Sequence, residues 1–111
     1  MSKQWVVTIA ERDYKIELEH NIWTNTQKVC INGQMIFESP TKLYIGGIIC
    51  FNIEGQTCAV IITNKMLGFS YDLIVNGISI ITQKRVKYAA TQPVAVMVNG
   101  VAQKINQDKE K

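Results

Sequence analysis

Three cysteines and one histidine are the residues of this chain whose types could ligate a metal: Cys30, Cys50, Cys58 and His20. Thiolates and imidazole are the usual ligands of zinc, and structural zinc sites take them in close pairs from a tight turn. None of the four forms such a pair, and the cysteines lie within or near apolar stretches where a small side chain is often buried. We therefore expect no metal site and no other cofactor.

Nucleophilic chemistry would need a cysteine thiolate beside His20, in a partly exposed and electropositive pocket. Nothing in the sequence around the cysteines supplies that pocket. His20 continues the inward parity of Ile16 and Leu18, which favours a partly buried, hydrogen-bonded histidine at a strand end. No glycine-rich loop precedes a helix in the manner of a phosphate site. We expect no catalytic residue and no enzymatic activity.

The stretch "HNIWTNTQ" at 20–27 is the candidate binding loop, because it combines Ile22 and Trp23 with Asn21 and Asn25. A solvated turn normally has no large apolar group. The favoured interpretation is that Trp23 folds back as a lid over one end of the molecule. The alternative is a partner-binding site formed by Asn21, Ile22, Trp23 and Asn25. Its ligand would be a protein, or a small molecule or carbohydrate stacked on Trp23.

The elements that must position these residues are strands, since apolar and polar residues alternate repeatedly with a period of two. In "YKIELEH", Tyr14, Ile16 and Leu18 fall on one face and charged residues on the other. The segment "TCAVIIT" is apolar on both faces, so it predicts a central strand covered on two sides. Other residues expected to face inward are Trp5, Val7, Ile9, Val29, Ile31, Leu43, Ile45, Ile49, Phe51, Ile53, Phe69, Tyr71, Leu73 and Val75.

Three Asn-Gly pairs, at 32–33, 76–77 and 99–100, predict tight hairpin turns. A two-residue type I′ turn needs positive φ at both central residues, which Asn tolerates and Gly permits. A polar turn at 11–13 is expected to close the first hairpin, and Gly46-Gly47 to form a bend or bulge. The turns predict these facing pairs: Ile31 with Gln34, Cys30 with Met35, Val29 with Ile36, Val75 with Ile78, Leu73 with Ile80, Val98 with Val101, Val96 with Gln103 and Val94 with Ile105.

About nine or ten short strands with regular turn signals predict an all-β fold: a barrel-like antiparallel β-sandwich whose hairpins are closed by Asn-Gly turns. We expect a single domain over 1–111, ending in an extra hairpin at 93–105 and a frayed tail at 106–111. The basic stretch "KRVKY" at 84–88 could touch an acidic partner, but a solvated connection is favoured. The outer strand near 101–105 could pair with a second copy, giving a homodimer.

Composition sets the remaining expectations. The chain has 111 residues, 47% of them apolar, and a formal charge of +3. This charge is too small to indicate a nucleic-acid partner. The longest apolar runs are far shorter than the roughly 20 residues of a membrane helix, so we expect no membrane contact and a cytoplasmic protein. An odd number of cysteines without a close pair predicts free thiols.

The order and spacing of these motifs resemble the Fas apoptotic inhibitory molecule family, an all-β domain first described in animals. The resemblance runs over about 5–81, through Trp5, "YKIELEH", "KVCING" and "GFSYDLIVNGISI". Its most specific part is the "GFSY" start of the strand that ends in Asn76-Gly77. It implies a compact β-sandwich without enzymatic activity that acts by contact with other proteins, to restrain apoptosis or resist protein aggregation.

Overall fold

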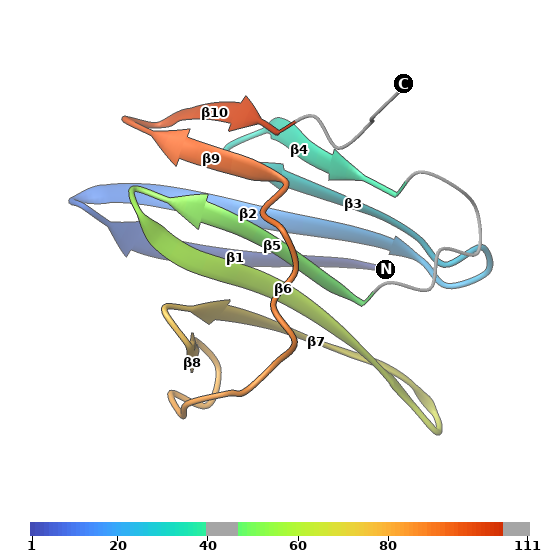
Figure 1. Ribbon diagram of the computed structural model, residues 1–111. Coiled ribbons are helices and arrows are strands. Elements are labelled where there is room, and N and C mark those ends of the chain that lie inside the picture. The colour runs from blue at the N-terminus through green and yellow to red at the C-terminus, as the bar shows by residue number, and fades with distance from the viewer. Residues whose placement is uncertain (40–46, 106–111) are drawn as a thin grey trace.

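The protein is a two-layer β-sandwich in a computed structural model that describes residues 1–39 and 47–105 (Figure 1). Sheet A has the strand order β1-β2-β3-β4, and sheet B has the order β10-β9-β5-β6-β7-β8. Neighbouring strands are antiparallel except for β5 and β9, which are parallel. The ten strands are β1 (Ser2–Ile9), β2 (Arg12–Asn21), β3 (Thr26–Ile31), β4 (Gln34–Glu38), β5 (Ile48–Ile53), β6 (Gln56–Lys65), β7 (Gly68–Val75), β8 (Ile78–Ser79), β9 (Ala95–Val98) and β10 (Val101–Lys104). The expected sandwich is confirmed, although its sheets do not close into a barrel.

No helix in the described part of the chain is long and apolar enough to cross a membrane.

The core lies between the two sheets and consists largely of residues that the alternation placed inward. In β9, however, Ala95 and Met97 are buried, whereas Val98 is exposed. Tyr14, Ile16 and Leu18 of β2 are almost completely buried against sheet B. Val7, Phe69 and Val75 are only partly buried, since they lie nearer the rim of the sandwich. Leu43, Ile45, Gly46 and the tail at 106–111 fall outside the described residues, so the predictions about them stay untested.

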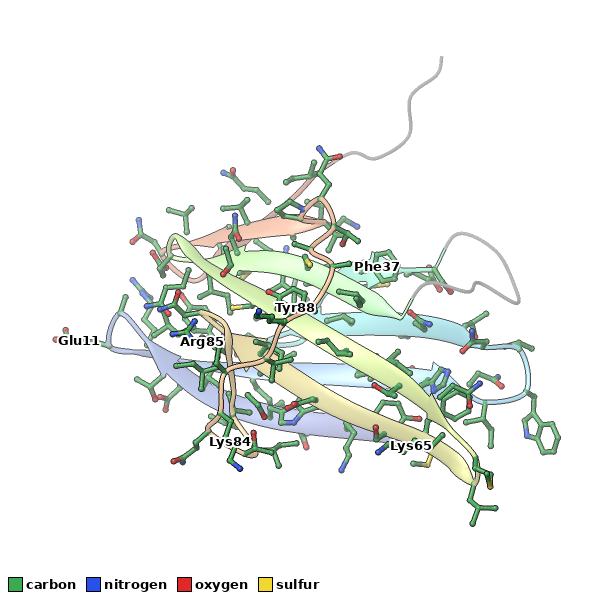
Figure 2. The ribbon with its side chains drawn as sticks, turned by 60° about the horizontal axis from the view of Figure 1, so that its bottom comes forward. Glu11, Phe37, Lys65, Lys84, Arg85 and Tyr88 are labelled. Atoms are coloured by element: carbon green, nitrogen blue, oxygen red, sulfur yellow. The ribbon has the colours of Figure 1, made fainter. Side chains whose placement is uncertain are left out.

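Sheet B is covered on both faces along its middle. Strand β6 lies between β5 and β7, and its consecutive residues Cys58, Ala59 and Val60 are all buried, which confirms the predicted central strand. The outer cover comes from the connection between β8 and β9, which crosses this face of the sheet (Figure 1). Val86 and Tyr88 pack there against a small cluster that contains Ala59 (Figure 2).

The expectation of a solvated connection was therefore wrong at these two positions. Lys84, Arg85 and Lys87 of the same stretch are exposed. The stretch alternates between partly buried and exposed side chains, and its three basic residues obscured that alternation. An apolar face on sheet B needs a cover, and this connection is the segment that supplies it.

The three Asn-Gly turns are confirmed, with φ of 51–54° at the asparagines and 79–82° at the glycines. Two registers agree with the predicted pairs, including Val75 with Ile78 and Val98 with Val101. In the hairpin of β3 and β4, Ile31 faces Gln34 and Cys30 faces Met35 as expected, but Val29 faces Phe37 rather than Ile36. A β-bulge between Val29 and Cys30 shifts the register, and it allows the side chain of Ile36 to be buried.

Two further turns adopt the same conformation without asparagine. Ala10 and Glu11, with φ of 52° and 64°, close the first hairpin, so its turn lies at 10–11 rather than 11–13. Glu54 and Gly55, with φ of 50° and 82°, close the hairpin of β5 and β6. Positive φ is unfavourable for Ala and Glu, so the pairing of the flanking strands or a side-chain contact must offset its cost.

The side chain of Glu54 makes such a contact, because it links the β5–β6 turn to β2 and to the β9–β10 turn. The Oε2 atom accepts hydrogen bonds from the Tyr14 hydroxyl at 2.8 Å and from the backbone N–H of Asn99 at 2.6 Å. Tyr14 belongs to sheet A, whereas Glu54 and Asn99 are turn residues of sheet B. The carboxylate therefore fastens the two sheets together at the end where the tight turns lie.

These bonds predict a loss of stability in acid. The hydrogen bond from Tyr14, with further ones from the backbone of Asn99 and Gly100, holds the pKa of Glu54 below its ordinary value. A carboxylate with a lowered pKa stabilises the fold above its unfolded-state pKa and loses that contribution as the pH falls through the folded-state pKa. The free energy of unfolding would be measured in urea between neutral pH and about pH 3. Glu54→Gln should be less stable than the wild type at neutral pH and should lose less stability on acidification. Parallel pH curves for the two proteins would contradict this role.

Candidate functional site

The two ends of the sandwich are built differently (Figure 1). The tight turns that join β1 to β2, β3 to β4, β5 to β6, β7 to β8 and β9 to β10 all lie at one end. The opposite end carries the β2–β3 loop and the β6–β7 turn, and we call it the loop end. All of the sequence-predicted binding residues are found there.

The β2–β3 loop is braced by its own asparagines. The Oδ1 atom of Asn21 accepts hydrogen bonds from the backbone N–H groups of Trp23 at 2.9 Å and Thr24 at 3.3 Å. The backbone N–H of Asn25 donates to the carbonyl of Asn21 at 2.7 Å, and Asn25 has a left-handed φ of 57°. In the binding alternative both asparagines face a ligand, whereas the Oδ1 atom of Asn21 braces the loop and that of Asn25 contacts His20 of β2.

Trp23 points into solvent rather than over the core. Its side chain is 86% exposed and that of Ile22 is 48% exposed. The favoured prediction of a lid was therefore wrong, and the alternative of an exposed indole is correct in geometry. The lid is unnecessary because His20 and the tyrosine beside it, Tyr71, already close this end of the core.

His20 is the residue that joins the loop to sheet B. It is 2% exposed, its Nδ1 atom lies 2.8 Å from the Tyr71 hydroxyl, and its Nε2 atom lies 2.6 Å from Oδ1 of Asn25. The ring also meets Phe69 edge-on, with centroids 4.6 Å apart. The prediction of a buried, hydrogen-bonded histidine is confirmed. Through its two ring nitrogens, His20 links Tyr71 of sheet B to Asn25 of the loop.

Beside the loop, a shallow depression of about 660 Å³ opens on the side of sheet A. Trp23 and Ile22 stand at its apolar side, and the rest of its lining is mainly polar, including Ser2, Glu19, Lys28 and Glu38. Glu19 and Lys28 form an exposed ion pair at 3.4 Å. This surface could receive a hydrogen-bonding peptide or ligand under the indole.

A second exposed apolar element at this end was missed from the sequence. Met66 and Leu67 form the tip of the β6–β7 hairpin, and each side chain is 98% exposed. They follow the polar residues Thr63, Asn64 and Lys65 and directly precede "GFSY", so they resemble the start of the next strand. A possible signal was the neighbouring glycine, because Gly68 has a φ of 131° that side chains rarely adopt.

The three cysteines are free thiols, and their exposure differs. Cys50 and Cys58 are buried, and burial raises the pKa of the Cys58 thiol to about 12. Burial also raises the pKa of Cys30, which is partly exposed on sheet A. Within residues 1–39 and 47–105, no group of three or more His, Cys, Asp or Glu side chains could hold a metal ion.

Comparison with known proteins gives one family. The model of the family described as Fas apoptotic inhibitory molecule (FAIM1) matches residues 1–111, the whole chain. The match therefore includes the final hairpin, which lies outside the 5–81 region where the sequence motifs were found. No curated protein matches the sequence.

The His20 contacts predict a coupled pair in stability measurements. His20→Phe keeps an aromatic ring against Phe69 but leaves the buried Tyr71 hydroxyl without its partner, so it should cost about 1–3 kcal/mol of unfolding free energy. Adding Tyr71→Phe removes that unpaired hydroxyl, so the double variant should be less destabilised than the sum of the single variants. Urea denaturation of all four proteins measures the coupling. Strict additivity would show that this contact contributes nothing.

Proposed function

The chain belongs to the Fas apoptotic inhibitory molecule family, and from that premise we propose that it is a non-enzymatic module that acts by binding other proteins. The proposal includes a role in restraining apoptosis, which family membership supports, with resistance to protein aggregation as a related role. It also includes a cytoplasmic location. The free thiols of all three cysteines support that location, since reducing compartments keep cysteines in this form.

The observation that carries the proposal is Trp23, held out from the sandwich on a braced loop. Tryptophan is among the residues most often found at the energetic centre of protein interfaces, where a large side chain fills a pocket on the partner. The hydrogen bonds from Asn21 fix the backbone beneath the indole, so little ordering is needed on binding. We assign the contact to Asn21, Ile22, Trp23 and Asn25, with the asparagines shaping the loop.

The absence of catalysis is part of the proposal. The thiol of Cys58 is buried and protonated at neutral pH, and both ring nitrogens of His20 are occupied by Tyr71 and Asn25. Nucleophilic catalysis needs a thiolate next to an available base. These contacts support a structural role for both residues.

A second candidate function is the binding of a small molecule or carbohydrate. The depression beside Trp23 favours it, because an indole next to polar groups is a common sugar-stacking arrangement. A glycan array or a thermal-shift screen with small ligands tests it, since a bound ligand raises the melting temperature by mass action. No response would leave the protein-binding function alone.

Self-association through an edge strand remains a further proposal. Strand β10 is at the edge of sheet B, and Val101 on it is 60% exposed. An edge strand can pair with a second copy through its free backbone groups. Its four residues and its closeness to β4 limit the length of such pairing (Figure 1).

The protein-binding function predicts a selective loss in Trp23→Ala. Affinity capture with the wild-type chain should recover partners whose yield falls at least tenfold with the variant, as expected for an interface hot spot. Because Trp23 is on the surface, unfolding stability should change by less than about 0.5 kcal/mol. Ile81→Ala, an exposed apolar residue just after β8, is the matched control. An identical partner set for all three proteins would remove Trp23 from the proposed contact.

The non-enzymatic function predicts slow alkylation. At neutral pH, iodoacetamide should modify the partly exposed Cys30 first and Cys58 last, because only the thiolate reacts and burial keeps Cys58 protonated. Mass spectrometry of peptides over time gives the three rates. Rapid modification of Cys50 or Cys58 in the folded protein would instead indicate an activated nucleophile.

A further inference from the structure

The β6–β7 turn exposes more apolar surface than any structural role in this fold requires. Met66 and Leu67 are each 98% exposed, and they are adjacent at the tip of a hairpin whose strands pair up to Lys65 and Gly68. Single exposed apolar residues are ordinary, but two large ones at a protruding tip indicate a contact surface. The tip takes no part in the core, so its residue types are free to serve binding.

The Met66–Leu67 tip and the β2–β3 loop that carries Trp23 lie at the same end of the molecule. Phe69, which follows the β6–β7 turn, contacts His20, and His20 is bonded to Asn25 in the β2–β3 loop. The bases of the two loops are therefore joined by direct contacts. Both views show the loops at the same end of the sandwich, with Lys65 close to the β6–β7 tip in the second (Figures 1 and 2).

The shape of the β6–β7 tip favours a lipid surface over a protein as its partner. Two depressions of the described residues are lined from sheet A, its N-terminus and the β2–β3 loop, and Met66 and Leu67 line neither of them. The tip projects from the end of sheet B as a hairpin turn (Figure 1). A protein partner would need a matching pocket, whereas the headgroup region of a bilayer accommodates apolar prongs of any spacing.

The charges around the tip also favour a lipid surface. The stretch from residue 55 to residue 71 contains no Asp or Glu, and Lys65 directly precedes the apolar pair. The chain as a whole has a formal charge of +3. At the Trp23 loop the nearby acid Glu19 is paired with Lys28, while Glu38 lies across the depression. The β6–β7 tip is therefore the part best matched to an anionic surface.

We propose that the Met66–Leu67 tip inserts among the headgroups of an anionic phospholipid bilayer, with Lys65 at the level of the phosphates and Trp23 beside it at the interface. Leu and Met supply buried apolar area, and tryptophan prefers the boundary between the acyl chains and the headgroups. This inference goes beyond the proposed function, because its ligand is a lipid surface rather than a protein. The expectation of no membrane contact rested on the length of apolar runs, which tests spanning and not insertion of a tip.

The experiment is co-sedimentation of the full chain with phosphatidylcholine vesicles, with and without phosphatidylserine. The wild type should bind the vesicles that contain phosphatidylserine more tightly. Met66→Ser combined with Leu67→Ser should lower that binding by about tenfold or more, and Lys65→Glu should remove the preference for phosphatidylserine. Val6→Ser combined with Ile81→Ser removes exposed apolar side chains outside the tip and should change nothing. Brominated lipids should quench wild-type fluorescence but not that of Trp23→Phe, whose remaining Trp5 is buried.

Three outcomes would overturn the proposal. Wild-type protein that binds neither kind of vesicle excludes a lipid ligand, and equal vesicle binding by the Met66/Leu67 double variant excludes this tip. Loss of protein capture in the double variant, without vesicle binding by the wild type, would assign the tip to a protein interface. Failure of the vesicle experiment leaves the protein-binding function intact, because that function is read from capture with Trp23→Ala.

Discussion

The inward face of β2 is the constraint on which the arrangement of the two sheets depends. Tyr14, Ile16, Leu18 and His20 form one column along this face, and all four are buried against sheet B. The middle of the column is aliphatic and supplies the apolar contact between the sheets. Its two ends are polar and directional: Tyr14 donates to Glu54 at the turn end, and His20 meets Tyr71 at the loop end. Apolar packing brings the sheets together, and these two contacts fix how they are aligned.

That alignment separates the molecule into an end that is needed for folding and an end that is available for contact. The tight turns use residues selected for positive φ, mostly Asn and Gly, and one of them also carries the Glu54 carboxylate. At the loop end, the backbone is held from below by His20 and Asn21. The side chains above it, Trp23 and the Met66–Leu67 pair, contribute nothing to the core. Binding residues can therefore vary there without changing the sandwich.

Much of this fold could be predicted from the sequence, because alternation and Asn-Gly pairs are local signals. The inward column of β2 and two of the hairpin registers follow from parity alone. The bulge at Ile36 could not be predicted, since it depends on where a buried side chain fits against the other sheet. The turn at Glu54-Gly55 could not be predicted either, because it lacks the usual asparagine. A hydrogen bond from the hydroxyl of Tyr14, which is distant in the sequence, supports its conformation.

The candidate site was predicted in part, and the errors have a physical pattern. Trp23 was correctly placed on a loop, but whether it covers the core depends on what else fills that end, and His20 and Tyr71 fill it. The exposure of Met66 and Leu67 depends on where β7 begins, because two apolar residues before "GFSY" can belong to the strand or to the turn before it. Tyr88 was expected in solvent but is partly buried. Its burial depends on the outer face of sheet B, which is formed by residues distant from it in the sequence.

The central claim is that this protein makes its contacts at the loop end, and hydroxyl-radical footprinting tests it most directly. Met66 and Trp23 are exposed, readily oxidised side chains at that end, whereas Met35 is a moderately exposed methionine elsewhere on the surface. Oxidation rates would be compared for the free protein and for the protein bound to its captured partner. The account predicts that one or both of Met66 and Trp23 become protected while Met35 reacts at an unchanged rate. Protection of Met35 with no change at Met66 and Trp23 would contradict it.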